Sequence, residues 1–176
     1  MVDTGNLSQI SVHSPEDATT NPSLILAAVN SDASNEHLSQ AVEFTIEEFL
    51  QAKAVAAAPK RKGRKPAKAP VEEKIQISKS EFSWSNLSAN EQSDILGIAI
   101  DKVAVNFGAA ISKIVPGYVS TEVDARLSFD EKSTIARAKR IIKFYKDIGI
   151  PKEKILIKIA ATWEGIQAAK KFDFSF

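Results

Sequence analysis

The chain has 176 residues, 44% of them apolar, which suffices for one domain with a sizeable core. Its 23 basic and 22 acidic residues nearly cancel, so net charge indicates no nucleic-acid, membrane or acidic partner. The lack of cysteine excludes disulfides, thiolate chemistry and cysteine metal sites. Because no secretion signal and no run of about 20 apolar residues is visible, we expect a soluble intracellular protein.

The N-terminal third is predicted to begin at the end of a strand and then to form two helices. A short apolar lead ends at Asp3, and the Thr-Gly-Asn that follows is typical of a turn. In DATTNPSLILAAV, Asn21 can cap a helix whose first residue is Pro22. From Asn35 to about Ala58, apolar residues recur at the spacing of an amphipathic helix.

Residues 55–80 differ in composition from the rest and are predicted to be a disordered basic insertion within a single domain. The run from Lys60 to Lys68 holds six basic residues, which supports one alternative: an inactive scaffold that acts as a nucleic-acid-binding or adaptor protein through residues 60–68. The run has no interleaved aromatic residues, however, and the net charge is only +1. A solvated loop is therefore the favoured interpretation.

The C-terminal half is predicted to alternate strands and helices. S-x-x-E capping boxes begin at Ser88 and Ser128, and they open helices that end near Lys113 and at Gly149. Two strands are predicted, GYVSTEVDA (117–125) and KILIKIA (154–160), and the second precedes a helix over 162–171. This alternation predicts an α/β fold with a buried parallel sheet, either a barrel or a doubly wound sheet.

Lys158 is the most informative candidate, because its neighbours in ILIKIA are isoleucine, leucine and alanine. Burial disfavours a charged ammonium group, so a lysine buried in such a strand would supply the free amine that attacks a ketone. A lysine near a strand end that reaches solvent is the structural alternative.

Three other polar residues accompany Lys158 near strand ends. Glu122 and Asp124 leave the same face of their strand, as general acids or bases or as partners of Arg126. Asp3 could equally form a turn, and Asn21 could be only a helix cap. Because the active sites of barrels lie at the carboxyl ends of the strands, these positions together favour a catalytic face.

The blocks DTGN, DATTNPSLI, IDKVAVNFG, IVPGYVSTEVDARLSFD and ILIKIAATWEGIQAA occur in an order similar to that of the classical transaldolases. The resemblance covers residues 2–29 and about 95–170, with an insertion between them. It implies a TIM-type (β/α)8 barrel, of which this chain holds about the first four βα units. It also implies no metal or organic cofactor, and transfer of a dihydroxyacetone unit between sugar phosphates in the pentose phosphate pathway.

The resemblance also implies residue roles and substrates. Lys158 would form the Schiff base, Asp3 would act as the acid/base at the C4 hydroxyl, Glu122 would act through a water in imine chemistry, and Asn21 would bind substrate hydroxyls. The implied substrates are fructose 6-phosphate, sedoheptulose 7-phosphate, erythrose 4-phosphate and glyceraldehyde 3-phosphate. A sibling aldolase would share the lysine chemistry. The family is usually cytoplasmic, and plastid forms are known.

The chain departs from the family pattern after FDFSF. The family's threonine that helps hold the catalytic water, and the serine and arginine that hold the substrate phosphate, have no counterpart. We therefore expect a truncated copy that keeps its catalytic residues without the phosphate site, which leaves its turnover open. The exposed strand edges of such a partial barrel predict instability and self-association.

Overall fold

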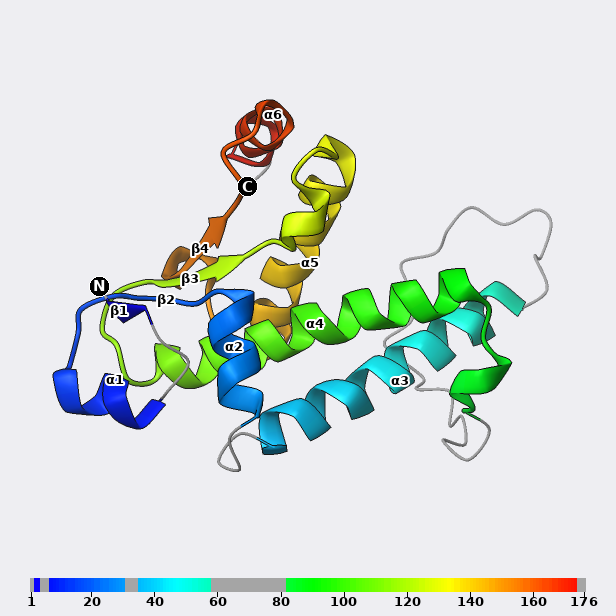
Figure 1. Cartoon of the computed structure of the whole chain (residues 1–176), viewed down its shortest axis with the longest axis horizontal. Helices are drawn as coiled ribbons and strands as arrows, with labels where there is room; N and C mark the ends of the chain where they lie inside the picture. The colour runs from blue at the N-terminus through cyan, green and yellow to red at the C-terminus, as the bar shows by residue number, and fades with distance from the viewer. Residues whose placement is uncertain (1, 4–6, 31–34, 58–81, 174–176) are drawn as a thin grey trace.

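A computed structural model describes residues 2–3, 7–30, 35–57 and 82–173. Four parallel strands form one sheet in chain order: β1 (Val2–Asp3), β2 (Ala18–Thr19), β3 (Val119–Glu122) and β4 (Ile155–Lys158) (Figure 1). This arrangement confirms the predicted α/β class and the parallel strand order. Most of the predicted basic insertion, including the run from Lys60 to Lys68, lies outside the described residues.

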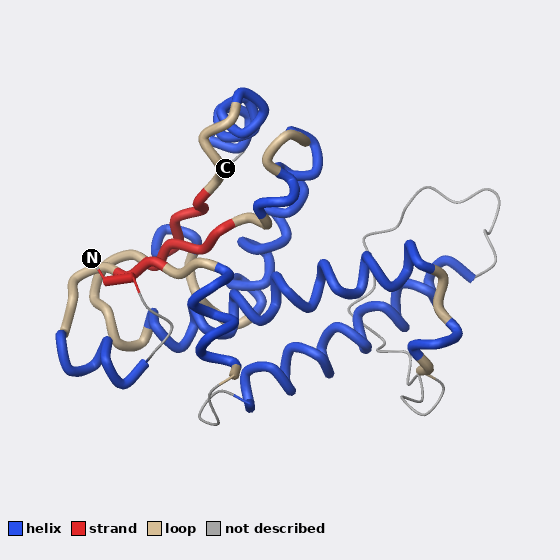
Figure 2. The backbone as a smooth tube through the Cα atoms, in the orientation of Figure 1, coloured by secondary structure: helices blue, strands red, loops and turns tan. Residues whose placement is uncertain are grey.

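Helices connect and cover the strands. They are α1 (Leu7–His13), α2 (Pro22–Val29), α3 (Asn35–Ala57), α4 (Ala89–Ser112), α5 (Glu131–Asp147) and α6 (Trp163–Asp173). The long helices α3 and α4 pack side by side and run in opposite directions, and the pair extends well beyond the sheet (Figures 1 and 2). The predicted helices α2, α3, α4, α5 and α6 are confirmed with small shifts at their ends, whereas α1 was not predicted.

The first predicted capping box is confirmed and the second is wrong. Ser88 and Glu91 cap each other at the start of α4. At the start of α5 the cap is Asp130, whose carboxylate accepts hydrogen bonds from the amide and hydroxyl of Ser133, 2.9 and 2.7 Å away. Ser128 instead donates to the Ala125 carbonyl in the preceding turn. Asp130 caps α5 in place of the predicted Ser128, because its carboxylate directly precedes the helix and accepts hydrogen bonds from the first turn.

The two faces of the sheet have different environments. Ala18, Val119 and Ile155 share one rung of the ladder, and all three are buried against the helices. On that same face, the Thr121 hydroxyl lies 2.6 Å from the Tyr145 hydroxyl of α5. Alternate residues point to the opposite face, where Leu156 is 45% exposed. The sheet therefore has one face packed on helices and one face that reaches solvent near β4.

Helix α4 is long and apolar enough to cross a membrane by length and composition. However, 61% of its most apolar window is buried within the fold, mainly against α3, α5 and β3. A core helix of a globular domain has the same composition, because it is covered on most sides.

Candidate active site

The four predicted site residues lie at the carboxyl ends of four adjacent parallel strands. Asp3 ends β1, Asn21 follows β2 by two residues, and Glu122 and Lys158 end β3 and β4. Because their rungs are in register and side chains alternate along a strand, Asp3, Glu122 and Lys158 belong to the face opposite the buried side chains of Val119 and Ile155. Asp3 lies two rungs below Glu122 and Lys158, in line with Thr19, Ser120 and Leu156.

Glu122 and Lys158 form the closest contact of the site. They are paired residues in the β3–β4 ladder, and Lys158 Nζ lies 2.9 Å from Glu122 Oε2. The ladder continues one step further, since the Val123 amide donates to the Lys158 carbonyl at 2.9 Å. The two side chains are therefore aligned by the backbone before any substrate binds.

Of the two environments considered for Lys158, the structure shows the strand-end position that reaches solvent. Its side chain is 44% exposed, and that of Glu122 is 22% exposed. Lys158 is the last residue of β4 and points away from the helices. Its neighbours Ile157 and Ile159 lie on the opposite face, so they do not cover the ammonium group. The alternative of a strand-end lysine that reaches solvent fits the structure, and the structure adds a carboxylate partner that the sequence did not indicate.

Asn21 has the capping role that its sequence context predicts. Its Oδ1 accepts a hydrogen bond from the Leu24 amide at 3.0 Å, and Pro22 occupies the first turn of α2. Asn21 also lines a cavity of about 540 Å³ together with Glu122. The cavity runs between α2, α3 and α4, and its apolar wall is formed by Ile25, Leu26, Val29, Leu38, Val42, Leu96, Ala99, Ile100, Val103 and Ala104.

Asp124 has a different environment from Glu122, although both line this cavity. The Asp124 carboxylate accepts two-pronged hydrogen bonds from the Arg126 guanidinium, the shortest at 2.6 Å, and lies 3.2 Å from Arg137 of α5. The predicted pairing with Arg126 is therefore confirmed for Asp124, whereas Glu122 pairs with Lys158. Hydrogen bonds from Arg126 lower the pKa of Asp124 to about 2.

This depressed pKa predicts that the ionised Asp124 carboxylate stabilises the fold and that strong acid removes the effect. The contribution is fully present above the pKa of an unfolded aspartate, near 3.8, and is lost as pH falls through about 2. A carboxyl NMR titration should therefore give a midpoint near 2 for Asp124. Arg126→Ala should move that midpoint upward. A midpoint in the ordinary aspartate range in the unmodified chain would contradict the contact.

Sequence reasoning missed the charged network behind Asp124. Arg137 bridges Asp124 to Asp101 of α4, and its Nε lies 3.3 Å from Asp101 Oδ1. Arg140 also pairs with Asp101, at 2.6 Å. The Asp101 side chain is only 3% exposed. Charged residues at these helix positions have no distinctive local pattern, so only the packing of α4 on α5 reveals the network.

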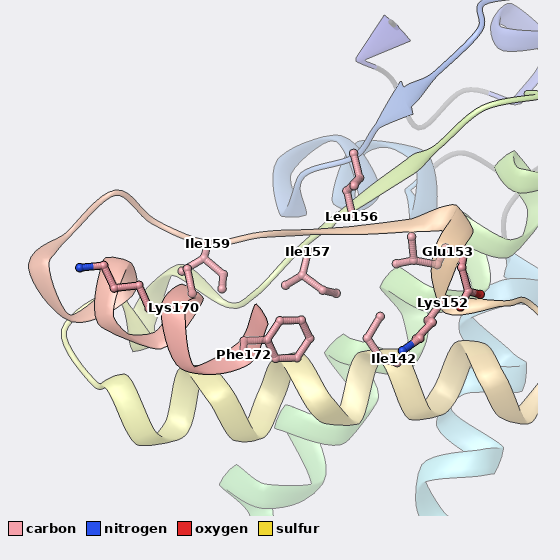
Figure 3. Close-up of a pocket in the computed structure, with 10 residues that line it drawn as sticks. Ile142, Lys152, Glu153, Leu156, Ile157, Ile159, Lys170 and Phe172 are labelled. Atoms are coloured by element: carbon pink, nitrogen blue, oxygen red, sulfur yellow. The ribbon is translucent and has the colours of Figure 1, made fainter. Parts of the chain in front are cut away.

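A second cavity, of about 610 Å³, lies between β4, α5 and α6 on the helix side of the sheet. Figure 3 shows Ile157 and Ile159 pointing into it beside Phe172, while Leu156 points the other way. Lys158 has the same strand parity as Leu156 and so faces away from this cavity. In the described part of the chain, no group of three or more histidine, acidic or cysteine side chains could hold a metal.

Comparison with known proteins agrees with this arrangement. Residues 68–174 match the family described as Transaldolase/Fructose-6-phosphate aldolase. The chain belongs to this family. It is 43% identical over 173 residues to transaldolase NQM1 of Saccharomyces cerevisiae, 42% identical to the transaldolase of Cricetulus griseus and 41% identical to that of Homo sapiens.

Each of these alignments covers 98% of this chain. The chain spans 40% of the length of these curated family members. The match includes β3, β4 and the helices after them, and therefore the Glu122–Lys158 pair. Family membership implies the TIM-barrel fold, and the described sheet is a parallel α/β arrangement that accords with it.

Proposed function

We propose that this chain carries the imine-forming part of a transaldolase, which transfers a dihydroxyacetone unit between sugar phosphates through a Schiff base on Lys158. The observation that carries the proposal is the contact between Lys158 and Glu122 at the carboxyl ends of adjacent parallel strands. Family membership supports the reaction class.

The ion pair with Glu122 explains how Lys158 could become a neutral amine, which is the nucleophile in this reaction. An ammonium group cannot attack a ketone, so Lys158 must first lose a proton, and Glu122 is 2.9 Å away to accept it. The free amine then adds to the C2 carbonyl of the ketose phosphate, and the resulting carbinolamine loses water to form the imine. In this proposal a water held by Glu122 carries the proton during imine formation and hydrolysis.

Asp3 and Asn21 take the remaining roles. Asp3 accepts the proton of the C4 hydroxyl as the C3–C4 bond breaks, which releases the aldose phosphate and leaves the three-carbon unit on Lys158. Asp3 lies on the same face as Lys158, two rungs lower, and this shared face supports the proposed role. Asn21, whose Oδ1 is engaged in the α2 cap, keeps its amide N–H groups available for substrate hydroxyls.

The four strands support a fold proposal as well. We infer that residues 1–176 form a single partial barrel corresponding to the first four βα units of the (β/α)8 fold. Within the described residues, β1 pairs only with β2, and β4 pairs only with β3. Parallel strands with such edges can add a further strand, so we also propose self-association through these edges. Sedimentation measured over a range of chain concentrations tests this.

The substrates proposed are fructose 6-phosphate and sedoheptulose 7-phosphate as donors, and erythrose 4-phosphate and glyceraldehyde 3-phosphate as acceptors. The proposed pathway is the pentose phosphate pathway and the proposed compartment is the cytoplasm. The matched family also includes fructose-6-phosphate aldolase, whose name describes cleavage without an acceptor sugar. Adding erythrose 4-phosphate distinguishes the two reactions, because a transferase passes the three-carbon unit to it without releasing free dihydroxyacetone, whereas an aldolase releases it.

The deciding experiment is reduction with borohydride in the presence of fructose 6-phosphate, followed by peptide mass mapping. We expect an adduct on Lys158 and on no other lysine. If a sample shown to be folded by circular dichroism gives no adduct at saturating sugar phosphate, Lys158 does not form the imine and the proposed function is wrong.

A further inference from the structure

Thr162 lies in the loop between β4 and α6, four residues after Lys158, and its hydroxyl makes two contacts. Its Oγ1 donates a hydrogen bond to the Ser128 carbonyl and accepts one from the Gly165 amide at 3.0 Å. The first contact crosses to the loop that follows β3, and the second caps the start of α6. One side chain therefore joins the two loops that follow Glu122 and Lys158.

The position of this contact matters because the ladder ends nearby. The last backbone hydrogen bond between the two strand ends runs from the Val123 amide to the Lys158 carbonyl. Beyond it the chain enters separate loops that lead to α5 and α6, which pack side by side (Figure 1). The Thr162–Ser128 bond links these loops again, so Lys158 is held between a ladder on one side and this side-chain bond on the other.

The loop after β4 is also held tightly against α6. The Ile166 amide donates to the Thr162 carbonyl at 2.9 Å. A Cβ atom on Gly165 would lie 2.1 Å from the Ala160 carbonyl oxygen, so only glycine permits this approach. These contacts hold residues 160–165 against the start of α6, so a contact at Thr162 constrains the whole connection from Lys158 to α6.

We propose that Thr162 is a positioning residue, whose hydroxyl keeps Lys158 in register opposite Glu122 by tying the loop after β4 to the loop after β3. The effect of Thr162 on imine formation rests on the proposed function, whereas its effect on the pairing of the β3 and β4 ends does not. Without the bond to Ser128, the carboxyl end of β4 would separate from β3 more often. Lys158 would then spend less time within reach of the Glu122 carboxylate.

Thr162→Val tests this, because valine keeps the shape of the side chain and removes the hydroxyl. Thr134→Val is the matched control. Thr134, on α5, donates to the Leu127 carbonyl at 3.0 Å, so it contacts the same loop one residue before Ser128 but has no link to the loop after β4. Thr162→Ser keeps the hydroxyl and should restore the behaviour of the unmodified chain.

The first measurement is hydrogen exchange at the Val123 amide, divided by the exchange rate of the Ile141 amide in α5. In Thr162→Val we expect this ratio to rise about fivefold to tenfold, which corresponds to the loss of the hydrogen bond to the Ser128 carbonyl, the one of the two that joins the strand ends. In Thr134→Val and Thr162→Ser it should stay unchanged. A general loss of folding stability would instead raise the exchange rates of the Val123 and Ile141 amides together and leave their ratio unchanged. Thr162→Ala provides the same test if the valine variant does not fold.

The second measurement is the rate of borohydride trapping at Lys158. We expect Thr162→Val to lower the rate at saturating fructose 6-phosphate about fivefold to tenfold, with little change in the half-saturating concentration. An unchanged Val123 ratio, or an equal rise in Thr134→Val, overturns the positioning role. If the unmodified chain forms no adduct, the proposed function fails, and the exchange ratio still decides the role of Thr162.

Discussion

Replacing Lys158 with arginine is expected to abolish adduct formation with fructose 6-phosphate and to leave the fold intact. The guanidinium group keeps a positive charge opposite Glu122, but it does not lose its proton at neutral pH and cannot form an imine. The exposed ion pair contributes at most about 1 kcal/mol to stability, so the melting temperature should change little. Borohydride reduction followed by peptide mass mapping measures the loss.

Lys170→Arg is the matched control for this substitution. Lys170 is an exposed lysine of α6 that borders the cavity on the helix side of the sheet, away from Glu122. This variant should form the Lys158 adduct at the same rate as the unmodified chain. A sugar adduct that persists in Lys158→Arg would show that another amine is the nucleophile.

Replacing Asp101 with alanine is expected to cost about 3–5 kcal/mol of folding free energy, because it leaves two partly buried guanidinium groups without their shared carboxylate. Arg137 and Arg140 both pair with Asp101, and the Arg137 side chain is only 13% exposed. Burial raises the pKa of Asp101, while the two arginines act in the opposite direction. For a domain whose stability is typically about 5–15 kcal/mol, this loss is large.

Denaturant unfolding of Asp101→Ala measures this effect, and Asp147→Ala is the control. Asp147 forms an exposed ion pair with Lys143 one turn away on α5, so its removal should cost about 0.5 kcal/mol or less. Equal losses in the two variants would mean that the network between α4 and α5 contributes no more than a surface pair. Circular dichroism shows whether Asp101→Ala still folds without denaturant.

Much of the helical structure was predictable because its signals are local. The Asn-Pro pair that begins α2 and the serine–glutamate box that begins α4 satisfy helix N–H groups within one turn, and both are confirmed. The Asp130 cap was missed because two capping patterns overlap in the sequence, and only the backbone conformation selects one. Helix α1 was missed because it has only seven residues and a single buried side chain, Ile10.

The candidate site was only partly predictable from local patterns. Strand alternation placed Glu122 on one face of β3, and the apolar context of ILIKIA singled out Lys158, but neither shows that the two side chains are in contact. That contact depends on the parallel register of β3 and β4, which pairs Glu122 with a residue 36 positions further along the chain. The sequence left open whether Lys158 is buried or reaches solvent, because a strand pattern does not say which face the helices cover.

The sequence by itself determined the alternation of strands and helices in the C-terminal half, the caps of α2 and α4 and the family to which the chain belongs, because each depends on neighbouring residues or on matched blocks. The tertiary structure alone decided the Glu122–Lys158 pair, the network around Asp101 and the bond from Thr162 to Ser128. These contacts join residues that are distant in the chain. Their geometry is set by strand register and helix packing, which no local pattern encodes.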